Sequence, residues 1–237
     1  MSIPHKAGIE VMQKGALRYQ LDDEGRPIRY QPWLGDAFAF LYDYFMTRSV
    51  FPKKFNASLE HHTAILAEAC QAFHGKQVLE LGTGAGSAAG FLPPDNNYVG
   101  SDVSTGLLKQ AVKRFNQAGF QEPEFYIASG DDLPFAGETF DLCLCILSLN
   151  FIGNHRQVFK EATRLLTDQG EFLCCVPVPE RNHQESTIRG RLLSEVRLQK
   201  LCQETGLSYE PIETDNGSLL YFQAINHVGS EIHVSKI

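Results

Sequence analysis

The sequence lacks any long apolar run. No stretch approaches the roughly 20 uninterrupted apolar residues that a membrane-spanning helix needs. Residues 1–19 mix charged residues throughout and contain no apolar core of the kind that a secretory signal peptide carries. We therefore expect a cytoplasmic protein with no membrane span.

The sequence also lacks a concentration of basic residues. Its 21 lysines and arginines are scattered among 28 aspartates and glutamates, which gives a formal net charge of −7. Proteins that bind nucleic acid present clustered basic residues that neutralise the phosphate backbone. We therefore expect no nucleic-acid partner and a small molecule as the binding partner.

Cysteine spacings typical of metal sites are absent too. The six cysteines form no Cys-x-x-Cys pair and no Cys/His ligand pattern, and they lie in apolar surroundings. Cysteines in such surroundings behave as small apolar residues, and free thiols are typical of a reducing compartment. We therefore expect buried free thiols and no metal site.

Strands and helices alternate from Gln77 onward. Short apolar runs bounded by turn residues predict seven strands, which are 78–81, 98–102, 125–128, 140–147, 171–176, 207–214 and 218–225. Such alternation predicts an α/β fold with a doubly wound, mostly parallel sheet. Pro211 has no N–H to donate to a neighbouring strand, and it therefore places the sixth strand at a sheet edge.

Cap residues predict where the helices begin and end. A helix over residues 58–73 has Asn56 or Ser58 as its N-cap. Ser104 is expected to cap a second helix that closes at Gly119. The last helix is expected over residues 194–205, ending at Gly206.

The strongest motif is the run Glu80-Leu81-Gly82-Thr83-Gly84-Ala85-Gly86, at the end of the first predicted strand. Glycine permits positive φ and lets a ligand approach the backbone, and ligands of open α/β sheets bind beyond the carboxyl ends of the strands. A dinucleotide-binding Gly-x-Gly-x-x-Gly turn would need glycine where the chain has Ser87 or Ala89. The strand-end glutamate also suits a cationic amine better than a pyrophosphate.

Acidic residues follow the next two strands. Asp102 ends the second strand, twenty residues after Gly82, where a carboxylate can accept both hydroxyls of a ribose. Asp131 and Asp132 follow the third strand, where an acid can accept an adenine amino hydrogen. The alternative is that these side chains only accept backbone N–H groups within turns.

Together these motifs resemble those of the class I S-adenosylmethionine-dependent methyltransferases. The similarity is greatest to the small-molecule branch that includes the ubiquinone and menaquinone biosynthesis enzymes. It covers residues 78–178, with weaker similarity in the two closing strands, and rests on the segments 78–86, 100–104, 130–135 and 165–170. The resemblance implies a Rossmann-like seven-stranded sheet with an antiparallel strand near the C-terminus, and S-adenosylmethionine as the cofactor.

The resemblance also implies a role for each motif residue. Glu80 is expected to meet the methionine amino group, Asp102 the ribose hydroxyls and Asp131 the adenine amino group. The other expected cofactor-binding residues are Gly82, Thr83, Gly84, Gly86, Val103, Asp132 and Leu133. The implied reaction is an in-line displacement, in which alignment of the reactants in a dry pocket supplies much of the catalysis.

The sequence departs from family members that methylate nitrogen in adenine bases and glutamine side chains. After the fourth strand it reads Ser148-Leu149-Asn150-Phe151, without the Asn/Asp-Pro-Pro-Tyr/Phe signature of those enzymes. We therefore expect a small, partly apolar methyl acceptor. The sequence leaves open the atom type that is methylated and the oligomeric state.

Aromatic residues gather upstream of these motifs. Nine of the 25 aromatic residues fall between Tyr30 and Phe55. Rigid aromatic side chains suit a pocket for an apolar acceptor, whereas the same residues can also form a helix that packs on the sheet. We divide the chain into an N-terminal extension, residues 1–57, which is a candidate lid, and a methyltransferase domain, residues 58–237.

Four polar residues are candidates for contact with the acceptor: Tyr42, His62, Asn150 and His155. A catalytic base is needed only if the acceptor must lose a proton, and Asn150 is suited to positioning the acceptor rather than deprotonating it. For each histidine the alternative is a surface or hydrogen-bonded structural role.

Two other functions fit the same motifs. A non-catalytic S-adenosylmethionine-binding sensor or partner subunit would keep the cofactor residues without turnover. A nicotinamide-dependent oxidoreductase would use a similar sheet and bind a dinucleotide. We favour the methyltransferase, because the glycine spacing and the acidic positions agree with it.

Overall fold

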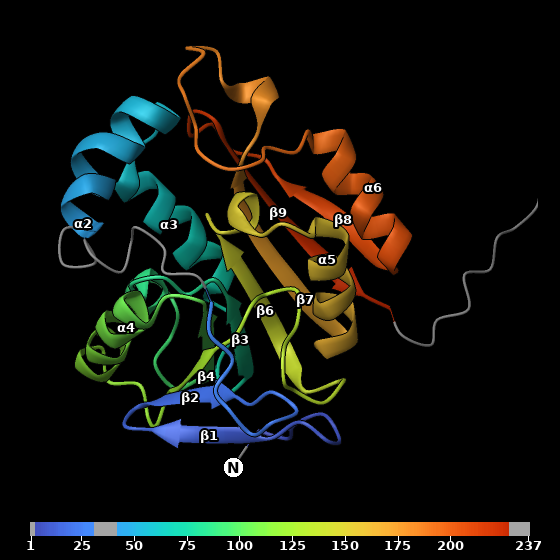
Figure 1. The fold of residues 1–237 in the computed structure, drawn as a ribbon. Coiled ribbons are helices and arrows are strands. Elements are labelled where there is room, and N and C mark those ends of the chain that lie inside the picture. Colours follow the sequence, from blue (N-terminus) through green and yellow to red (C-terminus); the bar gives the residue numbers. More distant parts are fainter. Residues whose placement is uncertain (1–2, 31–41, 228–237) are drawn as a thin grey trace, which may run out of the picture.

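A computed structural model of the chain describes residues 3–30 and 42–227, with Tyr42 described by its backbone alone. Within these ranges nine strands form one sheet (Figure 1). They are β1 (Val11–Lys14), β2 (Leu17–Gln20), β3 (Gln77–Leu81), β4 (Asn97–Asp102), β5 (Glu124–Ile127), β6 (Phe140–Ile146), β7 (Leu166–Pro177), β8 (Leu207–Ile212) and β9 (Leu219–Asn226).

The strands follow the order β1-β2-β5-β4-β3-β6-β7-β9-β8. Neighbouring strands from β2 to β7 are parallel, whereas β9 is antiparallel to β7 and β8, and β1 is antiparallel to β2. The predicted fold class, a mostly parallel α/β sheet with an antiparallel strand near the C-terminus, is confirmed. Pro211 lies in β8 at the edge of the sheet, as its missing N–H predicts.

The hairpin formed by β1 and β2 is an addition that the sequence pattern did not predict. Its strands have only four residues each, and β1 is mostly exposed, so neither shows a clear apolar alternation. β2 runs beside β5, with Leu17 opposite Phe125 and Tyr19 opposite Ile127. The hairpin thus extends the same sheet, and the division of the chain after residue 57 stays a prediction.

Helices cover both faces of the sheet (Figure 1). α3 (Leu59–Cys70) and α4 (Thr105–Gln117) lie on one face, and α5 (His155–Leu165) and α6 (Glu195–Thr205) lie on the other. The shorter helical elements are α2 (Tyr42–Phe45), the π-helical η2 (Met46–Phe55) and the single turns η3 (Ser87–Gly90), η4 (Leu149–Phe151) and η5 (Pro179–Arg181).

Each face of the sheet has its own apolar core. Phe159 of α5 and Leu198 of α6 pack with Phe172 of β7 in one core. Leu66 of α3 and Phe115 of α4 belong to the other. All five side chains are fully buried, and each such burial contributes about 1.5–3 kcal/mol to folding.

Three serines cap helices, of which Ser58 and Ser104 were predicted as caps. The hydroxyls of Ser58, Ser104 and Ser194 accept backbone N–H groups at 3.1–3.2 Å in the first turns of α3, α4 and α6. Asn56 instead follows η2 in the left-handed region, with φ 50°. Gly206 ends α6 with φ 88°, as predicted.

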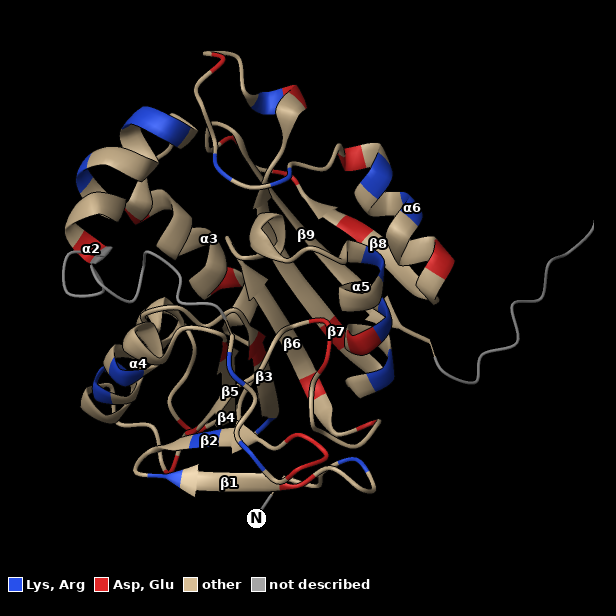
Figure 2. Ribbon diagram, in the orientation of Figure 1, with Lys and Arg blue, Asp and Glu red and all other residues tan. Residues whose placement is uncertain are grey.

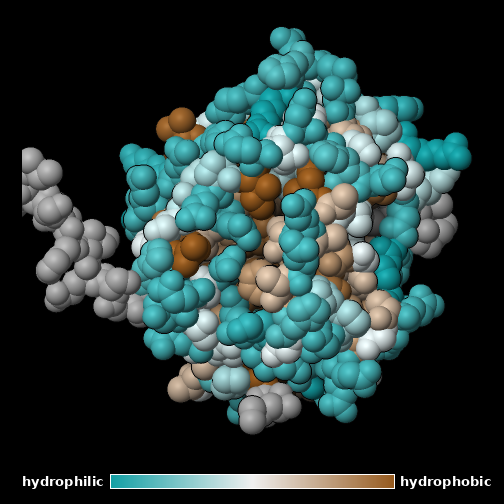
Figure 3. Space-filling view, turned by 180° about the vertical axis from the view of Figure 1, so that it is seen from behind, coloured by the Kyte–Doolittle hydropathy of each residue, from teal (hydrophilic) through white to brown (hydrophobic). Residues whose placement is uncertain are grey.

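The surface is mainly hydrophilic. Lysines and arginines are spread over several helices and the hairpin and are mixed with acidic residues (Figure 2). Seen from behind, apolar residues gather near the middle of the face and hydrophilic residues surround them (Figure 3). No helix in residues 3–30 and 42–227 is long and apolar enough to cross a membrane. All six cysteines are buried and unpaired, as expected.

Candidate functional site

The glycine-rich loop, residues 82–86, follows the carboxyl end of β3. The N–H groups of Gly82 and Thr83 both donate to the carbonyl of Ser101, at 2.8 and 2.9 Å, and tie the loop to β4. Because β4 and β5 end beside this loop, the three motifs that the sequence singled out meet along one edge of the sheet. Open α/β sheets bind their ligands at this edge.

Two of the loop glycines are required by close packing. A Cβ on Gly82 would clash with the side chain of Ser148, just beyond β6, and a Cβ on Gly86 would lie 2.8 Å from the Cα of Ala111 in α4. Gly82 and Gly84 have φ values of 73° and 55°, in the region that favours glycine, and both are half-buried. The loop is therefore packed tightly on its inner side while its backbone stays accessible.

Glu80 lies beneath the loop with 1% of its surface exposed. The hydroxyl of Tyr98, on β4, donates to the carboxyl group of Glu80, and the hydroxyls of Tyr98 and Thr83 are 3.1 Å apart. Burial raises the pKa of Glu80 to about 8, and the charge of Asp102 adds to this effect. The carboxyl group is therefore mostly protonated at neutral pH. Its contact with a methionine amino group stays a prediction.

Asp102 connects the end of β4 to the glycine-rich loop. Its Oδ2 accepts the N–H of Gly84 and its Oδ1 accepts the N–H of Ser104, both at 2.8 Å. The next residue, Val103, is 36% exposed although it is apolar. A carboxylate fixed at this edge with an exposed apolar neighbour is suited to a nucleoside, and the ribose contact stays a prediction.

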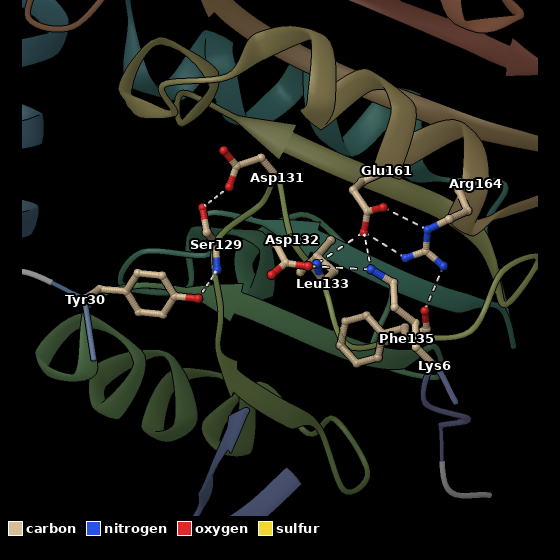
Figure 4. Close-up of polar contacts among 9 residues, drawn as sticks. All are labelled: Lys6, Tyr30, Ser129, Asp131, Asp132, Leu133, Phe135, Glu161 and Arg164. Carbon is tan, nitrogen blue, oxygen red and sulfur yellow. Dashed lines mark hydrogen bonds and ion pairs between the residues drawn. The ribbon is translucent and has the colours of Figure 1, made fainter. Parts of the chain in front are cut away.

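Asp131 and Asp132 lie in the loop that follows β5 (Figure 4). The hydroxyl of Ser129 donates to the Asp131 carboxylate, and the N–H of Asp132 donates to the carbonyl of Ser129 at 3.0 Å. Leu133 is fully buried in the core, and its N–H donates to the carboxylate of Glu161 at 3.2 Å. The two aspartate side chains are partly or fully exposed here, and their expected contacts with adenine stay predictions.

Among the acceptor candidates, His62 lies in the core. Its Nδ1 is 2.8 Å from the hydroxyl of Tyr221, and its ring centroid is 5.0 Å from that of Phe51. The residue is 4% exposed, and burial lowers the pKa of the imidazole to about 4. The environment of His62 is therefore that of a neutral, hydrogen-bonded structural histidine.

Asn150 lies in η4, between β6 and α5, and His155 is the first residue of α5. The Asn150 side-chain amide donates to the carbonyl of Arg189, and its backbone carbonyl accepts the N–H of Arg191, both at 2.7 Å. Both candidates are buried, and Asn150 Oδ1 and His155 Nε2 have no hydrogen-bond partner within the described residues. Burial, followed by the charge of Arg191, lowers the pKa of His155. Buried polar atoms of this kind are costly unless a ligand satisfies them.

The aromatic window is described only in part. The residues that lie outside the described part are Trp33, Phe38 and Phe40, together with the side chain of Tyr42. Tyr44 and Phe45 of α2 are exposed, whereas Phe51 and Phe55 of η2 are buried. The N–H of Ser218 donates to the Phe55 carbonyl at 2.7 Å. η2 is therefore packed against the turn between β8 and β9.

Three residues that shape the site, Tyr98, Ser148 and Glu161, were not predicted from the sequence. Tyr98 meets Glu80 only because of the register of β3 and β4, and Ser148 meets Gly82 only because β6 lies beside β3. Neither pairing has a local sequence signal. Glu161 has one, since it is an acid beside the buried Ala162 on the apolar face of α5 and pairs with Arg164 one turn later.

The residues at this edge fit the cofactor that the resemblance implies. Gly82 and Gly84 offer accessible backbone, Asp102 supplies a fixed carboxylate, and Val103 offers an exposed apolar surface. The unsatisfied atoms of Asn150 and His155 lie beyond the neighbouring strand β6.

Comparison with known proteins agrees with these motifs. Residues 79–174 match the family described as a methyltransferase domain. The chain is 30% identical to a fatty-acid O-methyltransferase of Mycolicibacterium smegmatis, over 63% of this chain and 52% of that protein. It is 33% identical to a ubiquinone/menaquinone biosynthesis C-methyltransferase of Rickettsia massiliae, over 31% of this chain and 30% of that protein. The chain thus spans about half or less of the length of these relatives.

Solved structures share the fold. The YcgJ protein of Bacillus subtilis superposes with a TM-score of 0.62 at 16% identity, over 72% of this chain and all of that one. A likeness at this level of identity concerns the fold alone. The matched domain, the sheet order and the motifs lead to one family, whose cofactor is S-adenosylmethionine. Residues 79–174 match the methyltransferase-domain family, and the named relatives together with the shared fold support a class I S-adenosylmethionine-dependent methyltransferase.

Proposed function

We propose that the protein transfers the methyl group of S-adenosylmethionine to a small, partly apolar molecule. The observation that supports this most is the hydrogen bond from the N–H of Gly84 to the carboxylate of Asp102, at 2.8 Å. It joins two motifs that are 18 residues apart at the edge of the sheet where a ligand binds.

The cofactor-binding residues act by holding and orienting. Asp102 would accept the ribose hydroxyls, Asp131 would accept an adenine amino hydrogen, and the accessible backbone of Gly82 and Gly84 would hold the methionine and ribose portions. The bound cofactor supplies an electrophilic methyl group on a sulfonium. Glu80 lies under the loop, where a cationic amino group above it would favour the ionised carboxylate.

The acceptor-binding residues lie beyond β6. Asn150 Oδ1 would accept a hydrogen bond from the acceptor and orient it, while the Asn150 amide keeps its bond to Arg189. His155 is uncharged at neutral pH because burial lowers its pKa, so its Nε2 can take a proton from the acceptor. Alignment in a pocket that excludes water supplies the rest of the rate.

Three observations support a small, partly apolar acceptor. Phe151, next to Asn150, is 51% exposed, and the aromatic residues Tyr44 and Phe45 of α2 are exposed as well. One relative is named for fatty acids and another for ubiquinone and menaquinone biosynthesis. Lysines and arginines form no single stripe on the face drawn in Figure 2, which favours a small molecule over a nucleic acid.

The N-terminal extension contributes a wall of the acceptor pocket through η2. This helix is held from two sides, since the Ser186 hydroxyl donates to the carbonyl of Lys54 and the N–H of Ser218 donates to that of Phe55. Ser186 follows β7 in the chain, and Ser218 lies beside the carboxyl end of β7, where its carbonyl accepts the N–H of Val178 at 3.0 Å. The part of the aromatic window in η2 is therefore fixed at the sheet edge that binds the ligand.

Formation of S-adenosylhomocysteine tests this function. The chain is incubated with S-adenosylmethionine and a panel of fatty acids, phenols, quinols and small amines. We expect product to form with at least one apolar acceptor and the Asp102→Ala variant to be strongly impaired at the same cofactor concentration. Binding of S-adenosylhomocysteine without turnover on any acceptor would instead favour the non-catalytic binding subunit.

A further inference from the structure

The N-terminal segment, residues 3–30, lies against the loop that follows β5. Besides the pairing of β2 with β5, the N–H of Lys6 donates to the carbonyl of Pro134 at 2.8 Å, and the N–H of Ala136 donates to that of Pro4 at 2.9 Å. These bonds lie at the far end of the loop that carries Asp131 and Asp132. The N-terminal segment, which lies upstream of the family motifs, thus holds this loop by backbone hydrogen bonds.

At its near end the loop is held by Tyr30. The hydroxyl of Tyr30 accepts the backbone N–H of Ser129 at 3.1 Å, directly after β5, and the Ser129 hydroxyl donates in turn to Asp131 (Figure 4). Burial raises the pKa of Tyr30, so its hydroxyl stays protonated at neutral pH. One side chain of the N-terminal segment therefore sets the position of the residue that orients Asp131.

On the opposite side the loop is held by Lys6. Its ammonium group lies 3.3 Å from Glu161 Oε2 and 3.6 Å from Asp132 Oδ1. Glu161 is 4% exposed, pairs with Arg164 at 2.8 Å and accepts the N–H of Leu133 at 3.2 Å (Figure 4). A buried carboxylate so bonded is rigid, and Lys6 completes the charge balance around it.

The segment also lines a half-open pocket of about 320 Å³ beside Val103. Its lining includes Tyr19, Ile28, Arg29 and Tyr30 from the N-terminal segment and Val103 and Ile127 from the sheet. Apolar walls with an aromatic ring and a few polar groups are typical of sites for planar ligands. The exposed face of Val103 is therefore opposed by residues that lie upstream of the methyltransferase motifs.

We propose that residues 3–30 form a clasp that closes the adenine end of the cofactor site, with Tyr30 as the positioning residue. The segment fixes the loop from Ser129 to Leu133 at both ends and supplies the outer wall of the pocket beside Val103. This inference rests on the proposed function and assigns residues 3–30 to the cofactor, in contrast to η2, which lies at the acceptor end.

Calorimetric titration with S-adenosylhomocysteine tests the clasp in the 237-residue chain. Tyr30→Phe removes the acceptor of the Ser129 N–H and is expected to weaken binding about five-fold. Tyr209→Phe is the matched control, because its hydroxyl donates to Glu195 at 3.0 Å at the far edge of the sheet. The control is expected to bind as the wild type does.

A second ligand separates positioning from a general loss of stability. S-Inosylhomocysteine carries a carbonyl in place of the adenine amino group, so at that position it has no proton to donate to Asp131. If Tyr30 positions the loop, Tyr30→Phe lowers the preference for S-adenosylhomocysteine over this analogue, whereas Tyr209→Phe leaves the preference unchanged. Lys6→Met, which releases the other side of the loop, is expected to act in the same direction.

The possible failures can be told apart. Equal affinities and equal preference in the wild type, Tyr30→Phe and Lys6→Met would overturn the clasp and leave the proposed function intact. Absence of any binding of S-adenosylhomocysteine to the wild type would overturn the proposed function itself. If Tyr30→Phe does not fold, the comparison of Lys6→Met with the wild type still decides.

Discussion

The hydroxyl of Tyr98 donates to the buried carboxyl group of Glu80, directly beneath the glycine-rich loop. Burial raises the pKa of this carboxyl group to about 8. The folded protein therefore keeps a proton on Glu80 at pH values where the unfolded chain has lost it. The stability of the folded protein therefore depends on pH through the proton on Glu80, which lies beneath the glycine-rich loop.

Thermal unfolding at different pH values tests the state of Glu80. Between pH 4.5 and pH 8 the folded state binds more protons at this residue than the unfolded state does, so the free energy of unfolding falls as the pH rises. Over this whole pH range the free energy of unfolding falls by about 4 kcal/mol through Glu80. Glu80→Gln mimics the protonated form, so its Tm is expected to stay nearly flat from pH 6.5 to pH 8 while that of the wild type falls. Parallel curves for the two proteins would show that Glu80 is ionised in the folded state.

His62 has the opposite pH dependence. Burial lowers its pKa to about 4, so the unfolded chain binds more protons between pH 4 and pH 6.5, and stability is lost as the pH falls through this range. The difference in Tm between the wild type and His62→Gln is expected to shrink toward acid pH. Because His62 is 4% exposed and bonded to Tyr221, kcat/KM of the variant at pH 7.5 is expected to remain within a few-fold of the wild type. A folded His62→Gln variant that has lost activity by orders of magnitude would make His62 catalytic.

The packing of Gly82 on Ser148 predicts a coupled pair of substitutions. Gly82→Ala introduces a Cβ that clashes with Ser148 and places alanine at φ 73°, where the backbone conformation alone costs about 1–2 kcal/mol. Ser148→Gly removes the clash but also the bond from the Ser148 hydroxyl to the Leu81 carbonyl. We expect the double variant to unfold at a higher temperature than the sum of the two single losses predicts. Strict additivity in chemical unfolding would exclude the contact.

Asn150 is predicted to serve the acceptor and not the cofactor. Its Oδ1 is buried without a partner in the described part of the chain, beyond β6. Asn150→Ala is expected to lower kcat at least ten-fold, which is the scale of one lost hydrogen bond. The Kd of S-adenosylhomocysteine is expected to stay within two- to three-fold of the wild-type value. Asn116→Ala, an exposed position on α4, is the control. A kcat equal to that of the control would move the acceptor away from Asn150.

The sequence predicted the central strands because short apolar runs between turn residues are typical of strands buried in a parallel sheet. It missed the start of β7, which begins at Leu166 and not near residue 171. Leu166 pairs with Phe140, and the pairing resumes only where Leu142 lies opposite Glu171, so residues 167–170 form an irregular bulge inside the strand in which Gln169 has φ 61°. The turn that Asp168-Gln169-Gly170 predicts is therefore present, as a bulge between two paired parts of β7.

The same distinction applies to the site. Asp102 and Asp131 could be chosen as candidates because their places follow from strand ends alone, and strand order brings them to one edge. The bond between Tyr30 and Ser129 joins residues 99 positions apart, and the bond between Glu80 and Tyr98 depends on which strands are neighbours. Contacts of this kind follow from the tertiary structure, and no local pattern encodes them.

Calorimetric titration of the 237-residue chain with S-adenosylhomocysteine measures cofactor binding at this edge most directly. The wild type is predicted to bind one equivalent, and Asp102→Ala to bind about 10- to 100-fold more weakly, since a desolvated ribose loses a charged acceptor. Asp168→Ala, an exposed aspartate at the start of β7 on the opposite edge, is predicted to bind as the wild type does. Failure of the wild type to bind, or an unchanged affinity in Asp102→Ala, would contradict the assignment of this edge to the cofactor.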